Sequence, residues 1–131
     1  MESKCHCGTV RFEVARPPAK VFDCNCSICR RLGVLWAYYR PRDVTWVSGR
    51  DATMVYLWGD HEIEFHACRT CGCTTHWQKA KDPDNAPKTG INARLMDNLD
   101  RSRVQVRQLD GSGTGVFWPP ATPGPARSDI T

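Results

Sequence analysis

The sequence contains no long hydrophobic run. Nowhere do about eighteen apolar residues follow one another, so the chain lacks the kind of segment that crosses a bilayer as a helix. Its first residues, MESKCHCGTVRFEV, contain neither the apolar core nor the small-residue cleavage site of a secretory signal. We therefore expect a soluble cytoplasmic protein without a membrane partner.

Basic residues form no run either, although they outnumber the acidic ones. The 131 residues include 18 Lys and Arg against 14 Asp and Glu, a formal net charge of +4. A nucleic-acid-binding domain usually concentrates its cations on one face or in one stretch, whereas here they are scattered. The pattern favours small anionic ligands and gives no reason to expect a nucleic acid partner.

No segment sustains the 3.6-residue hydrophobic repeat of a long helix. Short runs rich in β-branched and aromatic residues alternate instead with Gly, Pro and Asp, as in strands separated by turns. One short helix is expected over 27–32, and an exposed loop over 79–90. The expected strands are 9–14, 34–39, 43–47, 54–58, 62–67, 74–78 and 103–109.

These patterns predict one all-β domain of several small antiparallel sheets over 1–120, followed by a Pro- and Gly-rich tail over 121–131. Phe117 and Trp118 are expected to dock on the domain, because large aromatic side chains seldom remain in water. The simplest role for the other aromatic residues of the strands is core packing, and stacking on a ligand is the minority interpretation. These residues are Trp36, Tyr38, Trp46, Trp58, Phe65 and Trp77.

Cysteine is abundant, with 8 residues in this short chain. In a secreted domain such a number indicates disulfides, but in a reducing compartment it indicates metal ligation or thiol chemistry. The cysteines form a C-x-C pair, a C-x-C-x-x-C triplet and a C-x-x-C pair with one more cysteine two residues on. In order, these are Cys5 and Cys7; Cys24, Cys26 and Cys29; and Cys68 and Cys71 with Cys73.

The first and last clusters predict a structural zinc site. In an extended C-x-C both side chains point to the same face, so Cys5 and Cys7 can supply two ligands from a first strand. Cys68 and Cys71 can supply two more from a turn. A zinc ion held by these four would join distant parts of the chain and stabilise the fold. His6, between the first two ligands, is expected at the surface.

The middle triplet has no obvious fourth ligand. Zinc sites that do chemistry keep one position for water or substrate, whereas structural sites are closed by four protein ligands. Cys24, Cys26 and Cys29 therefore predict an open, catalytic zinc site. Arg30 and Arg31 follow directly, and either offset the thiolate charge and attract an anionic substrate or are solvated surface residues.

Taken together, the segments CHCGTVRFEV, CNCSICRRLG, FHACRTCG and GINARLM, in this order, resemble the glutathione-dependent formaldehyde-activating enzyme family, whose domain is shared with centromere protein V. The resemblance covers roughly residues 3–118. It implies an Mss4-like β-tent of small antiparallel sheets with two zinc ions. By position, Cys5, Cys7, Cys68 and Cys71 would be the structural ligands and the middle triplet the catalytic ligands.

The resemblance also implies a reaction, the condensation of formaldehyde with glutathione to S-hydroxymethylglutathione, which is a carbon–sulfur lyase reaction run backwards. The expected partners are therefore a small thiol and an aldehyde. A proton donor is needed for the new hydroxyl, and His66, His76, Thr74 and water are all conceivable. Thr74 stands where the founding enzymes have a histidine, which leaves the identity of the thiol open.

Two other functions fit the cysteine pattern. A zinc-ribbon-like module would bind nucleic acid or protein, and a thiol-redox or metal-buffering protein would oxidise the triplet or exchange its metal. Cys73 has open roles as well. On a strand it shares a face with Cys71, so it can act as a fourth ligand of the triplet or as a redox thiol, or it can be an inert buried cysteine.

Overall fold

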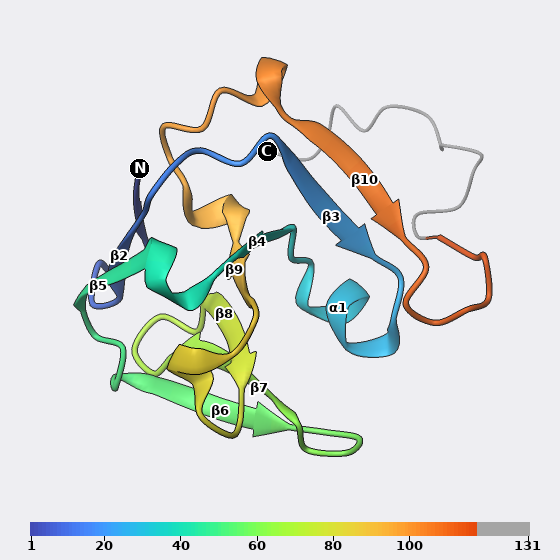
Figure 1. The fold of residues 1–131 in the computed structure, drawn as a ribbon, viewed down its shortest axis with the longest axis horizontal. Helices are drawn as coiled ribbons and strands as arrows, with labels where there is room; N and C mark the ends of the chain where they lie inside the picture. Colours follow the sequence, from blue (N-terminus) through green and yellow to red (C-terminus); the bar gives the residue numbers. More distant parts are fainter. Residues whose placement is uncertain (118–131) are drawn as a thin grey trace, which may run out of the picture.

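The computed structural model describes residues 1–117 and consists mainly of short strands with one short α-helix (Figure 1). Among these residues no helix is long and apolar enough to span a membrane. Four 3-10 turns lie at Pro41–Asp43, Pro83–Asn85, Ala93–Leu95 and Arg101–Arg103. The main elements are β1 (Glu2–Lys4), β2 (Arg11–Val14), β3 (Lys20–Cys24), α1 (Ser27–Leu32), β4 (Trp36–Tyr39), β5 (Val44–Ser48), β6 (Thr53–Leu57), β7 (Ile63–Cys68), β8 (Thr74–Lys79), β9 (Thr89–Asn92) and β10 (Gln105–Leu109).

The strands form two sheets. One has three strands in the order β1-β2-β5, and the other has seven in the order β10-β3-β4-β9-β8-β7-β6. All pairs are antiparallel except β10 and β3, which run side by side in parallel (Figure 1). The all-β prediction is confirmed and agrees with the expected Mss4-like β-tent. The parallel pair was not predicted, because β3 and β10 are distant in sequence and their pairing leaves no local signal.

All seven expected strands are present with small shifts at their ends, and α1 has the predicted bounds. Strands β1, β3 and β9 were not predicted. β9 contains Gly90, a residue that usually weakens a strand. Here glycine is required, because a Cβ at this position would collide with the indole nitrogen of Trp77 on the neighbouring strand. Close packing against Trp77 therefore overrides the low strand propensity of glycine.

The seven-stranded sheet separates two groups of buried side chains. On β4, Ala37 and Tyr39 join the main core, while Trp36 and Tyr38 point to the opposite face and join a second cluster. This follows from the two-residue period of a strand. The second cluster contains two of the triplet cysteines together with Trp77, so the triplet lies on the aromatic face of the sheet.

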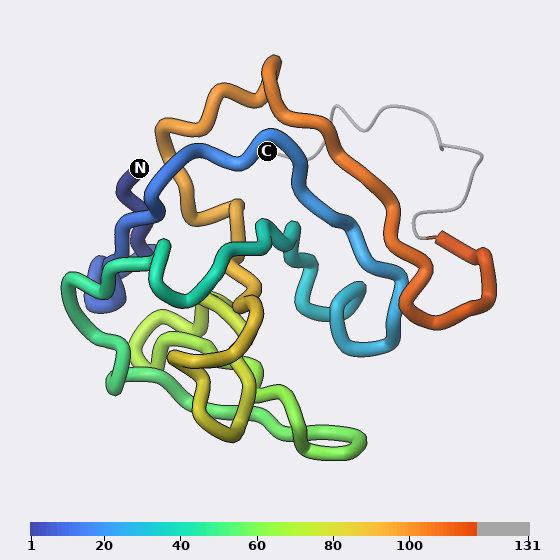
Figure 2. The backbone as a smooth tube through the Cα atoms, in the orientation of Figure 1, coloured from blue at the N-terminus to red at the C-terminus, as the bar shows by residue number. Residues whose placement is uncertain are grey.

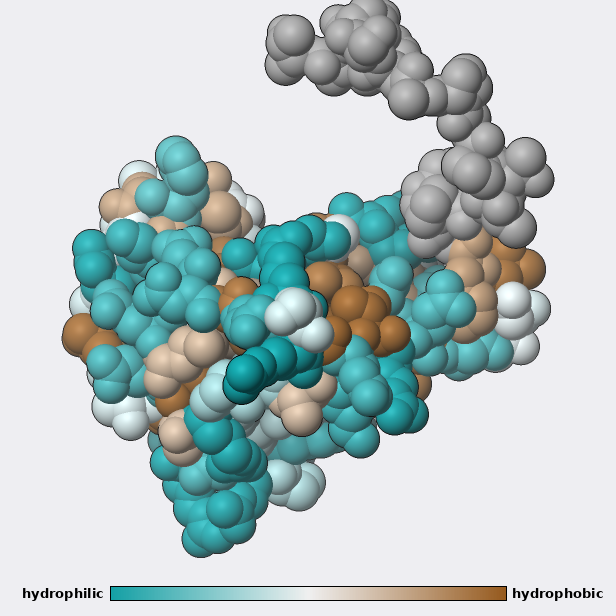
Figure 3. All heavy atoms as spheres, turned by 90° about the horizontal axis from the view of Figure 1, so that it is seen from above, coloured by the Kyte–Doolittle hydropathy of each residue, from teal (hydrophilic) through white to brown (hydrophobic). Residues whose placement is uncertain are grey.

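The face that Figure 3 shows is mainly hydrophilic, with a group of hydrophobic side chains near its middle. Strand β6 ends the seven-stranded sheet, and its side chains from Met54 to Leu57 are exposed. The loop predicted over 79–90 is shorter than expected, since Lys79 ends β8 and Thr89 and Gly90 begin β9 as buried residues; the connection over 80–88 is mostly exposed. Phe117 is partly buried. Trp118 and the predicted tail 121–131 lie outside the described residues.

Candidate metal centres and an aromatic cavity

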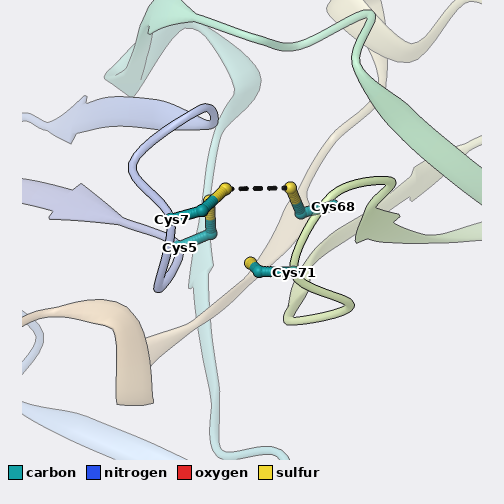
Figure 4. A group of neighbouring side chains, drawn as sticks. All are labelled: Cys5, Cys7, Cys68 and Cys71. Atoms are coloured by element: carbon teal, nitrogen blue, oxygen red, sulfur yellow. Dashed lines mark hydrogen bonds between the residues drawn. The ribbon is translucent and has the colours of Figure 1, made fainter.

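Four of the eight cysteines meet between the two sheets. Cys5 and Cys7 lie in the turn that joins β1 to β2, and Cys68 and Cys71 lie at the end of β7 and in the turn that follows (Figure 4). Their sulfur atoms all lie within 4.8 Å of one another. The prediction that Cys5 and Cys7 lie on a strand was wrong. The chain turns at Cys5, where the Gly8 N–H donates to the Cys5 carbonyl, and this turn brings both sulfurs to one point.

The spacing of the four sulfurs matches the donor set of a tetrahedral zinc ion. Zinc–sulfur bonds of about 2.3 Å in a tetrahedron separate neighbouring sulfurs by about 3.8 Å. Cys7 Sγ lies 3.7 Å from Cys5 Sγ and 3.7 Å from Cys68 Sγ. Cys5 and Cys68 are buried, whereas Cys7 is exposed. Four soft ligands at this spacing can hold one zinc ion and leave no position open.

Backbone N–H groups stabilise the sulfurs of this four-cysteine cluster. Val10 donates to Cys5 Sγ at 3.3 Å, and Thr70 donates to Cys68 Sγ at 3.4 Å. Hydrogen bonds from the backbone N–H groups of Cys7 and Cys73 lower the pKa of Cys71 to about 5. Cys71 is therefore prepared as a thiolate, the form that binds metal.

Cys73 lies next to this cluster and not at the triplet. Its carbonyl accepts a hydrogen bond from the Cys68 N–H at 2.9 Å, and the His6 N–H contacts its sulfur. It belongs to neither group of close sulfurs, so of the roles left open for it, that of a fourth ligand of the triplet does not fit. The side chain of His6 is exposed, as predicted.

The triplet forms a second cluster at the junction of β3 and α1. Cys24 is the last residue of β3, Cys26 is the N-cap of α1, and Cys29 lies inside the helix. Their sulfurs lie within 4.8 Å of one another. Cys26 Sγ accepts a hydrogen bond from the Cys29 N–H at 3.4 Å, so a cysteine sulfur takes the place of the usual capping oxygen. The helix ends at Gly33, which adopts the left-handed conformation.

The three thiols of the triplet differ in their surroundings. Burial raises the pKa of Cys29 far above its usual range and raises that of Cys24 as well. Burial acts on Cys26 too, but hydrogen bonds from the side chain and backbone of Cys29 lower its pKa overall. The Trp36 indole N–H donates to Cys29 Sγ at 3.3 Å inside the protein. This donor compensates a buried sulfur that carries negative charge when it binds metal.

The loop after β10 lies beside the end of β3 (Figure 2) and reaches the triplet through Asn25, a contact that the sequence did not indicate. The Asn25 amide donates to Asp110 at 2.6 Å and to the Val116 carbonyl at 3.0 Å, and its oxygen accepts from the Ser112 N–H at 3.0 Å. A Cβ on Gly111 would lie 2.6 Å from Cys24 Sγ. Asn25 thus anchors the loop, and glycine lets its backbone approach the sulfur.

A cavity of about 250 Å³ opens beside the triplet. The three cysteines form one side of it, and its other walls come from α1, β4, the end of β6, β7 and β8. None of the lining residues in the described part of the chain is charged. Apart from the cysteines, the lining residues are Ile28, Trp36, Tyr38, Trp58, Ile63, Phe65 and Trp77.

The aromatic side chains of this cavity were predicted as core residues. Trp36 and Trp77 are buried, but Trp58 is 43% exposed and stands at the mouth. The sequence signal was present in the alternation of Trp36 and Tyr38 on β4, which places both on the same face as Cys24. What the signal could not indicate was that the space in front of them remains open.

The proton donors that the sequence suggested do not line this cavity. His76 is fully buried and stacks on His66 with ring centroids 4.3 Å apart. Burial lowers the pKa of both, and that of His76 to about 3. Thr74 borders a different hollow, between α1 and β6. Among the lining residues that the structure describes, Tyr38 alone carries a hydroxyl, and burial raises its pKa to about 12, so this hydroxyl keeps its proton.

The two arginines after the triplet lie at the surface. Arg30 and Arg31 are exposed in the last turn of α1, and Arg31 donates to the Ser27 carbonyl at 3.0 Å. Neither lines the cavity. Of the two interpretations of these residues, their positions agree with solvated surface side chains.

Comparisons with known proteins agree with this architecture. The family model described as glutathione-dependent formaldehyde-activating enzyme matches residues 1–109, so the chain belongs to this family. A Rhodobacter sphaeroides protein of known crystal structure superposes with a TM-score of 0.69 at 31% identity, over 83% of this chain and 100% of that one.

A protein of Halomonas elongata is 38% identical to this chain over 61 residues, which make up 43% of this chain. Its name assigns it provisionally as a glutathione-dependent formaldehyde-activating enzyme. The match spans only 39% of the length of that relative.

Proposed function

We propose that the protein is a zinc-dependent enzyme of the carbon–sulfur lyase type, which forms and cleaves the adduct of a small glutathione-like thiol with an aldehyde such as formaldehyde. The observation that carries this proposal is the triplet beside a cavity. Cys24, Cys26 and Cys29 form one cluster, and within residues 1–117 no fourth Cys, His, Asp or Glu joins them. An open position facing a cavity is typical of a catalytic zinc site.

The three sulfurs fit zinc because they are soft donors grouped within 4.8 Å. Zinc held by Cys24, Cys26 and Cys29 would lower the pKa of an incoming thiol and so favour its thiolate. Trp36 holds the Cys29 sulfur in place through its indole N–H. The apolar walls keep water away from the reacting groups, which strengthens electrostatic interactions there.

The reaction requires the formation of one carbon–sulfur bond and the transfer of one proton. The thiolate sulfur attacks the carbonyl carbon, the carbon–sulfur bond forms, and the π electron pair moves to the oxygen, which then takes a proton. Tyr38 carries the hydroxyl of the cavity wall, and we assign it to hydrogen-bond this oxygen. The reverse sequence releases the thiol and the aldehyde.

The four-cysteine cluster has a different role in this proposal. Cys5 and Cys7 belong to the turn of the three-stranded sheet, whereas Cys68 ends an inner strand of the seven-stranded sheet and Cys71 lies in the turn after it. A zinc ion there would join the two sheets and contribute its binding free energy to folding.

Exchange spectroscopy by NMR on mixtures of glutathione and formaldehyde tests the proposal, because it measures the rate of adduct formation and cleavage at equilibrium. We expect the wild-type protein to accelerate this exchange and Cys26→Ser to lose at least about a hundredfold of the acceleration, as ligand loss should exceed the effect of losing a supporting contact. The matched control is Cys73→Ser, which should exchange at the wild-type rate. Equal acceleration by Cys26→Ser and wild type would overturn the proposal.

A further inference from the structure

The cavity beside the triplet has the wrong chemistry for the polar parts of glutathione. Glutathione carries two carboxylates and an ammonium group, and such charges need charged or hydrogen-bonding partners when they leave water. The cavity walls supply indole, phenyl and aliphatic surfaces, and among the lining residues within 1–117 only Tyr38 carries a hydroxyl. Lys88, whose Nζ lies 4.6 Å from the Tyr38 ring centroid, is exposed and does not line the cavity. The peptide part of a thiol must therefore remain outside.

The cavity is also far larger than formaldehyde requires. An engineered apolar cavity of about 150 Å³ binds benzene, and this one measures about 250 Å³. Its walls already pack in tilted and edge-on aromatic geometry. The rings of Trp36 and Phe65 lie 6.4 Å apart at 45°, and those of Tyr38 and Trp77 lie 6.1 Å apart at 62°. A further ring fits this kind of arrangement well.

We propose that this cavity binds the organic group of the aldehyde, and that the substrate aldehyde is aromatic or carries another bulky apolar group. This inference rests on the proposed function and narrows its substrate class. The thiolate sulfur bonds to the carbonyl carbon at the triplet, the oxygen receives the proton that the thiol gave up, and no electron acceptor is needed. The side chain of the aldehyde occupies the aromatic cavity, with Trp58 over its mouth.

Two stable thioethers of glutathione provide a binding test that does not depend on activity. S-benzylglutathione and S-methylglutathione share the peptide and differ by a phenyl ring. Titration by calorimetry, with tryptophan fluorescence as a second readout, should show the benzyl compound binding about ten- to a hundredfold more tightly, the gain expected for burying one ring. Equal dissociation constants would overturn the inference.

Variants of residues that line the cavity test whether the cavity causes the tighter binding of S-benzylglutathione. Trp58→Ala removes a lining residue that is 43% exposed, so the fold should tolerate it, and it should weaken binding of S-benzylglutathione several-fold. Tyr56→Ala is the matched control, since Tyr56 is 56% exposed on β6 and does not line this cavity. Ile63→Trp fills the cavity and should abolish the preference for the benzyl compound. A preference that survives Ile63→Trp would contradict the assignment of the cavity.

Rates separate this inference from the proposed function. With glutathione held constant, exchange of the benzaldehyde adduct should be accelerated at least about tenfold more than exchange of the formaldehyde adduct, each relative to its uncatalysed rate. Equal acceleration of both adducts would retain the thiol–aldehyde function and overturn the apolar substrate class. Acceleration of neither would overturn both, because the substrate class depends on the reaction.

Discussion

Replacing Trp36 with phenylalanine removes the indole N–H that donates to Cys29 Sγ at 3.3 Å. Trp36 is 1% exposed and Cys29 is 8% exposed, so water cannot replace the lost donor easily. A hydrogen bond to a charged group contributes about 1.5 to 3 kcal/mol. This corresponds to about a ten- to a hundredfold loss of zinc affinity at the triplet, which agrees with the range for contacts that support metal ligands.

The assay is competition with a zinc chelator on the purified protein. Wild type should hold two zinc ions tightly, and Trp36→Phe should hold one tightly and release the other at a lower chelator concentration. Trp77→Phe is the control, because Trp77 is also buried and lines the same cavity but is not hydrogen-bonded to a sulfur in the described structure. Both variants lose similar core volume. Equal loss of zinc from the two variants, or none from Trp36→Phe, would refute the reasoning.

Three further predictions concern other parts of the structure. Gly111→Ala places a Cβ 2.6 Å from Cys24 Sγ, so elemental analysis should find one zinc per chain instead of two. Burial lowers the pKa of His76 to about 3, so the unfolded state alone takes up its proton below about pH 6.5. The free energy of unfolding should then fall by about 1.4 kcal/mol for each unit that the pH drops between about pH 6.5 and 3. Denaturant unfolding at several pH values should show that the stability of His76→Gln depends less on pH than that of the wild type. Cys73→Ser should keep both zinc ions, whereas Cys71→Ser should lose one; loss of zinc from Cys73→Ser would contradict the ligand set.

The ligand clusters were predictable because cysteine spacing is a local signal. In C-x-x-C a single turn brings two sulfurs together, and the sulfurs of Cys68 and Cys71 do meet those of Cys5 and Cys7. The strand assumed for the first pair was wrong, yet the same four cysteines meet because a tight turn also brings two sulfurs together. Helix 27–32 was predictable for the same reason, since its caps, Cys26 and Gly33, directly flank it in the sequence.

The cavity and the loop above the triplet depend on contacts that the sequence does not encode locally. Alternation places Trp36 and Tyr38 on one face, but core and cavity wall share this pattern. The loop at Gly111 reaches Cys24 only because β10 pairs with β3 in parallel. Likewise, the two-residue spacing between Cys71 and Cys73 suggested that Cys73 could have a role at the triplet. The path of the turn, which the sequence does not indicate, places it by His6 instead.

Cobalt substitution tests the central claim most directly, because cobalt(II) bound to thiolates absorbs strongly through sulfur-to-metal charge transfer. If Cys24, Cys26 and Cys29 hold a metal with one position open to a thiol, adding glutathione to the cobalt-loaded protein should raise this absorption as a fourth sulfur joins. The Cys26→Ser protein should not respond. An unchanged spectrum in the wild-type protein, at thiol concentrations that support exchange, would contradict the account.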